Sequence, residues 1–218
     1  FDTPLSEGGI AAIAFGMGLN GLKPVCEIQF ADYIFPAYDQ IVNEIAKLRH
    51  RSGGEFWTPI TIRTPAGGGI RGGHHHSQSP ESQFTHTPGL KVVYSSTPYN
   101  AKGLLISAIE SEDPVIVFEP KRCYRGPFYG DPHKVPTWSG HAEAEVPDVH
   151  YNVPIGEARL VTEGNDCTVI AWGTMVHVCE EGIRQSGASC DLIDLQSLIP
   201  WDREAVVRSV KKTGRCVI

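Results

Sequence analysis

The sequence predicts an α/β protein in which an open, mainly parallel sheet carries helices on both faces. Short runs rich in β-branched residues alternate along the chain with longer runs that carry apolar residues at helical spacing. This alternation is typical of parallel sheets, whose ligands bind beyond the carboxyl ends of the strands. A second and shorter alternation follows an irregular stretch, so a second α/β unit is expected.

The first predicted element is a helix over residues 8–19. Pro4 and Ser6 precede this run and Asn20-Gly21 follows it, which is the pattern of a helix start and a glycine stop. The run is rich in glycine and alanine, so we expect the helix to pack closely against a neighbour. A short buried strand is predicted next, over residues 25–30.

A second helix is predicted over residues 36–51, where Ile41, Ile45 and Leu48 recur at helical spacing. It ends at the Gly53-Gly54 break. The rest of the first unit is predicted as a strand, a glycine-rich loop, a strand, a helix and a strand, over residues 60–63, 67–80, 90–94, 99–110 and 115–118.

Composition divides the chain into three parts. Residues 1–124 form a first domain, residues 125–154 shift to Pro, Gly, His and acidic residues as expected of a surface linker, and residues 155–218 form a second domain. The second domain is predicted to contain strands over 167–172, 190–195 and 216–218 and helices over 176–184 and 201–212. Because the chain begins at Phe1 without a methionine and stops within a predicted strand, we expect a piece of a longer protein with both domains incomplete.

The composition also argues against several function classes. A formal net charge of -6 and a pI near 5.8 give no electrostatic basis for binding nucleic acid or an anionic membrane. No run approaches the roughly 20 apolar residues that a bilayer needs. The six cysteines contain no C-x-x-C pair, which indicates reduced thiols rather than a disulfide frame or a zinc ribbon. We therefore expect a soluble intracellular protein.

Two single residues are candidates for chemistry, each with a simpler interpretation. Glu7 stands in the first turn of the first predicted helix, where the helix macrodipole favours a carboxylate. Tyr33 lies in the aromatic run of residues 30–33, and an isolated tyrosine of this kind is most simply a packing residue.

The segment over residues 67–80 combines a glycine-rich loop with His74-His75-His76. Its glycines permit close backbone approach to a ligand, with His76 at the end of the loop as a proton donor or acceptor. No Gly-Lys-Ser/Thr follows, so phosphate binding of the P-loop type is not indicated.

The histidine triplet also invites a metal hypothesis, because histidine is the commonest metal ligand near neutral pH. Adjacent residues of an extended segment point to opposite sides, so three consecutive histidines do not easily share one ion. A non-catalytic metal-binding or scaffolding module built around this triplet stays open as an alternative.

Several segments lie in order along nearly the whole chain and carry a family resemblance. Three of them read FDTPLSE, EIQFADYIFPA and HSQSPE, and the full set covers residues 1–7, 27–37, 76–81, 88–93, 101–105, 118–121 and 199–202. Together they resemble the beta subunits of thiamine-diphosphate-dependent 2-oxo acid dehydrogenases. Within that family, residues 29–37 and 171–174 look most like the branched-chain enzyme, and residues 136–139 look like its bacterial form.

The resemblance implies a pyrimidine-binding domain followed by a partial transketolase C-terminal-like domain, with thiamine diphosphate between subunits. In the family, a glutamate at the position of Glu7 hydrogen-bonds N1′ of the aminopyrimidine. Tyr33 would pack on that ring, with Gln29 as a polar neighbour. His76 would act in proton transfer while the acyl group passes to a lipoyl group.

The resemblance further implies a structural potassium ion, held largely by backbone carbonyls. The matching positions are Ile60, Thr61, Ala108, Ser111 and Asp113. A hard cation needs oxygen ligands rather than particular side chains, so the residue types at these positions are compatible with it.

No Gly-Asp-Gly segment with a downstream asparagine, which in thiamine enzymes holds magnesium and the diphosphate, occurs in this chain. A separate alpha subunit is therefore expected to supply it in an alpha2beta2 heterotetramer, with a lipoyl-bearing acyltransferase as the acceptor. The implied activity is oxidative decarboxylation of branched-chain 2-oxo acids such as 3-methyl-2-oxobutanoate. A beta subunit acting on pyruvate or acetoin is the alternative, because its cofactor residues would be the same.

Overall fold

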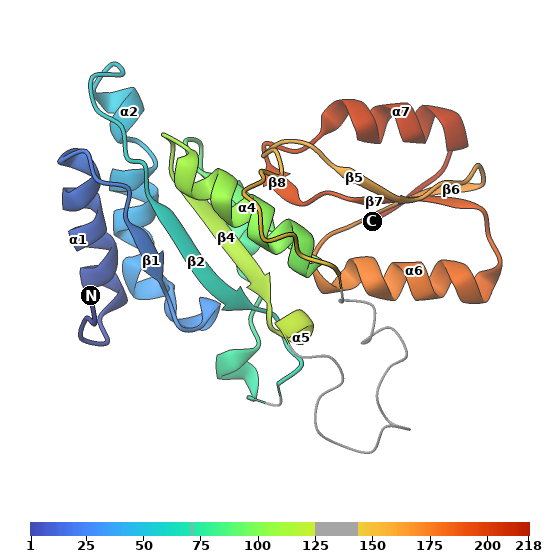
Figure 1. Cartoon of the computed structure of the whole chain (residues 1–218), viewed down its shortest axis with the longest axis horizontal. Helices are drawn as coiled ribbons and strands as arrows, with labels where there is room; N and C mark the ends of the chain where they lie inside the picture. Colours follow the sequence, from blue (N-terminus) through green and yellow to red (C-terminus); the bar gives the residue numbers. More distant parts are fainter. Residues whose placement is uncertain (71, 125–143) are drawn as a thin grey trace.

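The computed structural model describes residues 1–70, 72–124 and 144–218. It contains a larger and a smaller sheet that lie side by side, each with its own helices (Figure 1). The larger sheet has the strand order β1-β2-β4-β3-β8. Its strands are β1 (Val25–Glu27), β2 (Thr61–Ala66), β4 (Val115–Pro120), β3 (Lys91–Tyr94) and β8 (Ser197–Ile199).

The predicted mainly parallel sheet is confirmed. Strands β1 to β4 are parallel to one another, whereas β8 reaches over from the second unit and pairs antiparallel with β3. This antiparallel edge strand was not expected from the sequence, because three residues between two predicted elements carry too little pattern to indicate a strand.

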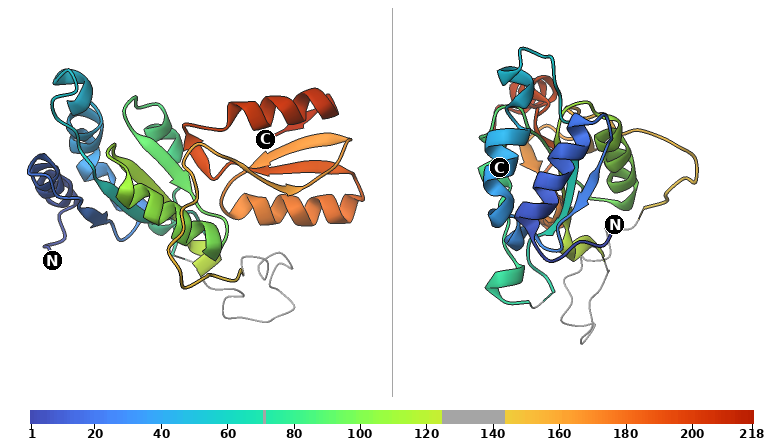
Figure 2. Two further views of the ribbon diagram at one scale, coloured as in Figure 1. Left: turned by 45° about the horizontal axis from the view of Figure 1, so that its top comes forward. Right: turned by 90° about the vertical axis from the view of Figure 1, so that its left-hand side faces the viewer.

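Two apolar layers cover the larger sheet, because successive residues of a strand point to opposite faces. On β4, Ile116 and Phe118 join the core beneath α1 (Glu7–Leu19), whereas Val117 joins the core beneath α4 (Pro98–Glu110). The right-hand view of Figure 2 shows α4 and the helices of residues 40–51 on opposite sides of the sheet. Helices on both faces are thus confirmed.

The single helix predicted over residues 36–51 is wrong. A 3₁₀ helix, a π-helix and an α-helix take its place, as η2 (Phe35–Ala37), η3 (Gln40–Ile45) and α2 (Leu48–Arg51). The Ala46 amide donates to the Ile41 carbonyl at 2.9 Å, five residues back, and both side chains are buried. Apolar spacing therefore predicted the buried face correctly but not the type of helix.

The smaller sheet has the order β5-β7-β6-β9, with β6 parallel to both of its neighbours and β5 antiparallel to β7. Helices α6 and α7 lie on opposite sides of it (Figure 1). These elements are β5 (Arg159–Thr162), β6 (Cys167–Ala171), α6 (Thr174–Ser186), β7 (Cys190–Asp194), α7 (Arg203–Thr213) and β9 (Cys216–Val217).

Buried polar contacts join the two units. The Tyr94 amide donates to the Gln196 carbonyl at 2.8 Å, and Asn100 Nδ2 donates to Gln196 Oε1 at 3.0 Å. The Ser96 hydroxyl donates to the carboxylate of Asp194, which is fully buried. Burial raises the pKa of Asp194 against the effect of that hydrogen bond. Because the polar groups of Tyr94, Asn100, Ser96 and Gln196 pair across the junction, the contacts favour one arrangement of the units.

Residues 144–154, the described part of the predicted linker, lie along α4. The Ser107 hydroxyl donates to the Val153 carbonyl at 2.7 Å, and the ring of Tyr151 stacks on that of Tyr99 with centroids 4.5 Å apart. A Cβ at Gly103 would lie 2.5 Å from Val153, so the helix needs a glycine where this segment crosses it. Residues 125–143 of the predicted linker lie outside the described residues.

All six cysteines are free thiols. Burial raises the pKa of Cys26 to about 11, which keeps this thiol protonated and unreactive. Within the described ranges, no helix is both long enough and apolar enough to cross a membrane.

Candidate active site

Tyr33 and His76 meet beyond the carboxyl ends of the strands. Tyr33 ends the 3₁₀ helix η1 (Ala31–Tyr33), which follows β1, and His76 ends the 3₁₀ helix η4 (His74–His76), in the loop after β2. The Tyr33 hydroxyl lies 2.9 Å from His76 Nε2. Strand β1 stops three residues before the predicted end at residue 30, and this early stop leaves room for η1 at the edge of the sheet.

The second ring nitrogen of His76 is also held. Nδ1 lies 3.0 Å from the Gly72 carbonyl. A carbonyl oxygen only accepts, so Nδ1 carries a proton, and in the neutral imidazole Nε2 is then the acceptor. The Tyr33 hydroxyl donates to Nε2 in this tautomer, so the imidazole is oriented from both sides.

Phe30 completes an aromatic cluster around the histidine. Its ring meets the His76 ring edge-on, with centroids 4.6 Å apart and an interplanar angle of 90°. It also meets the Tyr33 ring edge-on, at 5.6 Å and 83°. Such edge-to-face contacts restrict ring orientation, so Phe30 fixes both polar side chains although it was not among the predicted site residues.

The glycines of the loop allow its main chain to approach the His76 side chain closely. A Cβ at Gly72 would lie 2.6 Å from the Cβ of His76, a distance that real side chains do not adopt. Gly73 has a φ of 66°, a left-handed value that other residues rarely take. The loop can therefore fold the Gly72 carbonyl back onto the imidazole only because these two positions are glycine.

Asp32 supports this site from behind the loop and was not predicted from the sequence. Its side chain is buried, and Oδ1 accepts the amides of Ser77 at 3.1 Å and of Gln78 at 3.2 Å. The sequence offered one signal for Asp32, because this acid lies between the aromatic residues Phe30 and Tyr33. The carboxylate thereby ties the loop that carries His76 to η1.

Glu7 and Gln29 lie at the same edge of the sheet but outside this contact. Glu7 begins α1, and the following residue, Gly8, packs on η2, since a Cβ at Gly8 would lie 3.0 Å from the Pro36 carbonyl. Within the described residues, the Glu7 carboxylate and the exposed Gln29 side chain make no hydrogen bond. The structure thus brings Tyr33 and His76 together and leaves the polar groups of the other two available to a ligand.

The other two histidines of the triplet have a different environment. His74 and His75 are exposed, with ring centroids 3.8 Å apart, while His76 is partly buried against Tyr33. Over the described ranges, no three His, Cys, Asp or Glu side chains are grouped so that they could hold a metal ion. This geometry gives the metal-binding alternative no support.

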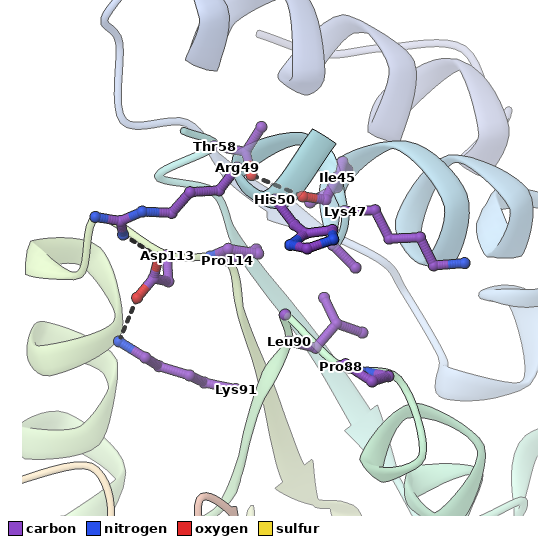
Figure 3. Close-up of a pocket in the computed structure, with 12 residues that line it drawn as sticks. Ile45, Lys47, Arg49, His50, Thr58, Pro88, Leu90, Lys91, Asp113 and Pro114 are labelled. Atoms are coloured by element: carbon purple, nitrogen blue, oxygen red, sulfur yellow. Dashed lines mark hydrogen bonds and ion pairs between the residues drawn. The ribbon is translucent and has the colours of Figure 1, made fainter. Parts of the chain in front are cut away.

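The five positions predicted for potassium lie at the opposite, amino-terminal edge of the sheet. They gather where α4 ends and where β2 begins. Asp113 among them lines a pocket of about 610 Å³ (Figure 3). The Ile60 carbonyl accepts the Val115 amide and the Ala108 carbonyl accepts the Ser111 amide, so each keeps a second lone pair for a cation. A donor set of carbonyl oxygens suits a hard cation.

Two basic side chains pair with Asp113 at the amino-terminal edge of the sheet and neutralise its charge. Lys91 Nζ lies 3.1 Å from Asp113 Oδ2 and donates to Ser111 Oγ at 3.1 Å, and Arg49 pairs with the other oxygen of Asp113 (Figure 3). Burial raises the pKa of Asp113, but the two cations outweigh it and hold the pKa below its usual range. Any cation at this edge would depend on carbonyl oxygens more than on this carboxylate.

Comparison with known proteins places the chain in a family. The model of the transketolase pyrimidine-binding domain matches residues 1–127, which include Glu7, Tyr33 and His76. The chain belongs to this family. The model of the transketolase C-terminal domain matches residues 156–218.

Curated relatives of this transketolase-like chain are beta subunits. The 2-oxoisovalerate dehydrogenase subunit beta of Pseudomonas aeruginosa is 54% identical over 100% of this chain and 63% of the relative. The mitochondrial 2-oxoisovalerate dehydrogenase subunit beta of Dictyostelium discoideum is also 54% identical, over 100% of this chain and 56% of the relative. The pyruvate dehydrogenase E1 component subunit beta of Acholeplasma laidlawii is 45% identical over 100% of this chain and 63% of the relative.

These matches confirm the resemblance to branched-chain beta subunits. The chain spans between 45% and 63% of the length of the curated relatives that it matches. Among solved structures, a split gene transketolase described as an inactive beta4 tetramer has a TM-score of 0.73 and 22% identity, over 99% of this chain and 63% of that chain. The structural match supports the fold alone.

Proposed function

We propose that this chain is the cofactor-binding part of the beta subunit of a 3-methyl-2-oxobutanoate dehydrogenase of the 2-methylpropanoyl-transferring type. The reaction is oxidative decarboxylation of branched-chain 2-oxo acids, followed by acyl transfer to a lipoyl group. The observation that carries the proposal is the Tyr33–His76 contact, which lies within the matched pyrimidine-binding region and joins two segments of the family resemblance. High identity to 2-oxoisovalerate dehydrogenase beta subunits supports the branched-chain substrate.

Thiamine diphosphate, when bound, supplies the electron sink for the decarboxylation. Glu7 would hold N1′ of the aminopyrimidine, and its carboxylate suits this role because it has no hydrogen-bond partner within the described residues. Tyr33 offers an aromatic ring and Gln29 a polar amide at the same edge of the sheet. Glu7 would share a proton with N1′, and this proton sharing is the acid-base contribution that the chain itself would make.

His76 would move a proton during acyl transfer. Its Nδ1 proton is held by the Gly72 carbonyl, so exchange takes place at Nε2, which already accepts from the Tyr33 hydroxyl. A histidine is suited to this task because an imidazole nitrogen can both accept and donate a proton. Tyr33 and Phe30 keep the imidazole in one orientation and so remove the need to order it during the reaction.

The proposed partners follow from what the chain lacks. No Gly-Asp-Gly segment is present, so magnesium and the diphosphate would be held mainly by an alpha subunit, in an alpha2beta2 heterotetramer. A lipoyl-bearing acyltransferase would accept the acyl group. We place the complex in the bacterial cytoplasm, or in the mitochondrial matrix if the source is eukaryotic, because relatives of both kinds are known.

Two further assignments belong to the same proposal. Residues 1–124 would form the pyrimidine-binding domain, 125–154 the linker and 155–218 the transketolase C-terminal-like domain. A structural potassium ion would be held by oxygens at Ile60, Thr61, Ala108, Ser111 and Asp113, at the edge of the sheet opposite Tyr33 and His76. It would take no part in the reaction.

A pyruvate- or acetoin-directed beta subunit is the second candidate, favoured by the 45% identity to the Acholeplasma pyruvate dehydrogenase subunit. The complete alpha-beta complex is expected to use 3-methyl-2-oxobutanoate at least about tenfold better than pyruvate in kcat/KM, because a pocket shaped for the larger apolar group gains binding from each extra carbon. Carbon dioxide release with an artificial electron acceptor measures both substrates. If the complex instead prefers pyruvate by a similar ratio of kcat/KM, the chain belongs to the second candidate.

A further inference from the structure

A buried ion pair lies behind the Tyr33–His76 contact. Lys121 Nζ is 3.7 Å from Asp32 Oδ2, and the two side chains are 3% and 2% exposed. Asp32 belongs to η1, and Lys121 begins α5 (Lys121–Tyr124) directly after β4. Removing two charges from water is costly, so a buried pair at this place calls for a specific role beyond the apolar packing around it.

Asp32 acts on the loop that carries His76. One oxygen, Oδ1, accepts the amides of Ser77 and Gln78, the two residues that follow His76, at 3.1 and 3.2 Å. The other oxygen, Oδ2, faces Lys121 and accepts no hydrogen bond from the residues that the structure describes. Hydrogen bonds from amides to a charged acceptor are about twice as strong as neutral ones, so the carboxylate fixes the loop immediately after the histidine.

Lys121 acts on the same histidine from a second side. Its ammonium lies 4.9 Å from the centroid of the Phe30 ring, in a cation–π contact. The Phe30 ring in turn meets the His76 ring edge-on at 4.6 Å. Burial lowers the pKa of Lys121, and Asp32 opposes that shift. The pair thus touches the main chain after His76 through Asp32 and the ring beside His76 through Lys121.

We propose that Asp32 and Lys121 are positioning residues that hold the His76 imidazole for acyl transfer to the lipoyl group. The inference rests on the proposed function, and it concerns one of the two half-reactions only. Neither residue needs to touch substrate or cofactor. A proton-transferring histidine is effective only within a narrow range of positions, and a buried polar contact behind it restricts the loop to one of them.

The test distinguishes the loss of the Asp32 oxygen as a hydrogen-bond acceptor from the loss of the buried charge. In Asp32→Ala/Lys121→Met the buried charge is removed together with the acceptor for Ser77 and Gln78. In Asp32→Asn/Lys121→Met the charge is removed but a carbonyl acceptor remains. In the complete alpha-beta complex, the alanine variant is expected to lose at least about tenfold in reductive acylation of a lipoyl domain, with decarboxylation by an artificial electron acceptor within about threefold of normal. The asparagine variant is expected to recover most of the loss.

Asp191 and Lys212 provide a matched control in the second unit. They form an ion pair at 2.6 Å, and Asp191 accepts the Gly164 amide at 2.9 Å and is also buried. Asp191→Ala/Lys212→Met is expected to change the two half-reactions in parallel, through stability alone. Hydrogen exchange gives a readout apart from activity: the amides of Ser77 and Gln78 should exchange at least about tenfold faster in Asp32→Ala/Lys121→Met than in the control.

A parallel loss of both half-reactions in Asp32→Ala/Lys121→Met, like that of the control, would overturn the inference and leave the pair a structural role. Unchanged exchange at Ser77 and Gln78 would overturn it as well. If the unmodified complex shows no thiamine-dependent decarboxylation, the proposed function itself fails, and the exchange experiment still reports whether the pair holds the loop.

Discussion

Replacement of Glu7 by glutamine is expected to reduce 2-oxo acid decarboxylation by more than about 100-fold, the lower range for a positioned acid-base group. Glutamine keeps the size of the side chain but removes the carboxylate that would share a proton with N1′. Glu7 begins α1 and makes no hydrogen bond within the described residues, so the substitution breaks no protein contact there. Assembly should therefore remain nearly intact, although the helix loses the favourable charge at its first turn.

The measurement is carbon dioxide release by the purified alpha-beta complex, with gel filtration to verify assembly. Glu110→Gln offers a control, because Glu110 is an exposed acid at the last turn of α4, on the other face of the sheet, and its carboxylate pairs with the exposed groups of His150 and Asn152. It is expected to keep turnover within about twofold, as surface substitutions usually do. Normal turnover in an assembled Glu7→Gln complex would contradict the assignment of Glu7 as the residue that holds N1′.

His76→Ala is expected to reduce acyl transfer to the lipoyl group by about 100-fold or more, with a much smaller effect on cofactor binding. The substitution removes the imidazole, whose Nδ1 is held by the Gly72 carbonyl and whose Nε2 is held by the Tyr33 hydroxyl. His74→Ala/His75→Ala should stay within a few-fold of normal, since these exposed side chains contact each other and substitutions of this kind typically change stability by under about 0.5 kcal/mol.

Two assays on each histidine variant are needed, decarboxylation with an artificial electron acceptor and reductive acylation of a lipoyl domain. If the double variant loses acyl transfer while His76→Ala retains it, the catalytic histidine is wrongly assigned. That result would favour the metal-binding interpretation of the triplet.

Much of the larger sheet was predictable because its strands are short apolar runs between clear breaks. Ile116 and Phe118 face one core and Val117 the other, and a strand buried on both faces shows as a continuous apolar run. The helix types at residues 35–51 were not predictable, because a π-turn and an α-turn place Ile41 and Ile45 on the same buried side. Strand β8 depends on pairing between segments about a hundred residues apart, which local pattern does not encode.

The candidate site also contains residues that the sequence predicted and residues that it did not. Tyr33 and His76 were expected to share a site from the family resemblance, and their contact agrees with it. Asp32 and Lys121 were not identified, since nothing near either residue in the sequence indicates a partner 89 positions away. Burial of both charges becomes visible only once β1 and β4 are placed in one sheet.

The claim that this chain supplies the pyrimidine half of a shared cofactor site is tested most directly by calorimetric titration of the complete beta subunit with thiamine diphosphate and magnesium. The subunit alone is expected to bind with a dissociation constant above about 100 μM, because this chain carries Glu7, Gln29 and Tyr33 but no Gly-Asp-Gly segment. Adding an alpha subunit that carries the Gly-Asp-Gly segment should tighten binding by at least about 100-fold, which corresponds to about 2.8 kcal/mol. Micromolar or better affinity of the beta subunit alone would contradict the shared site.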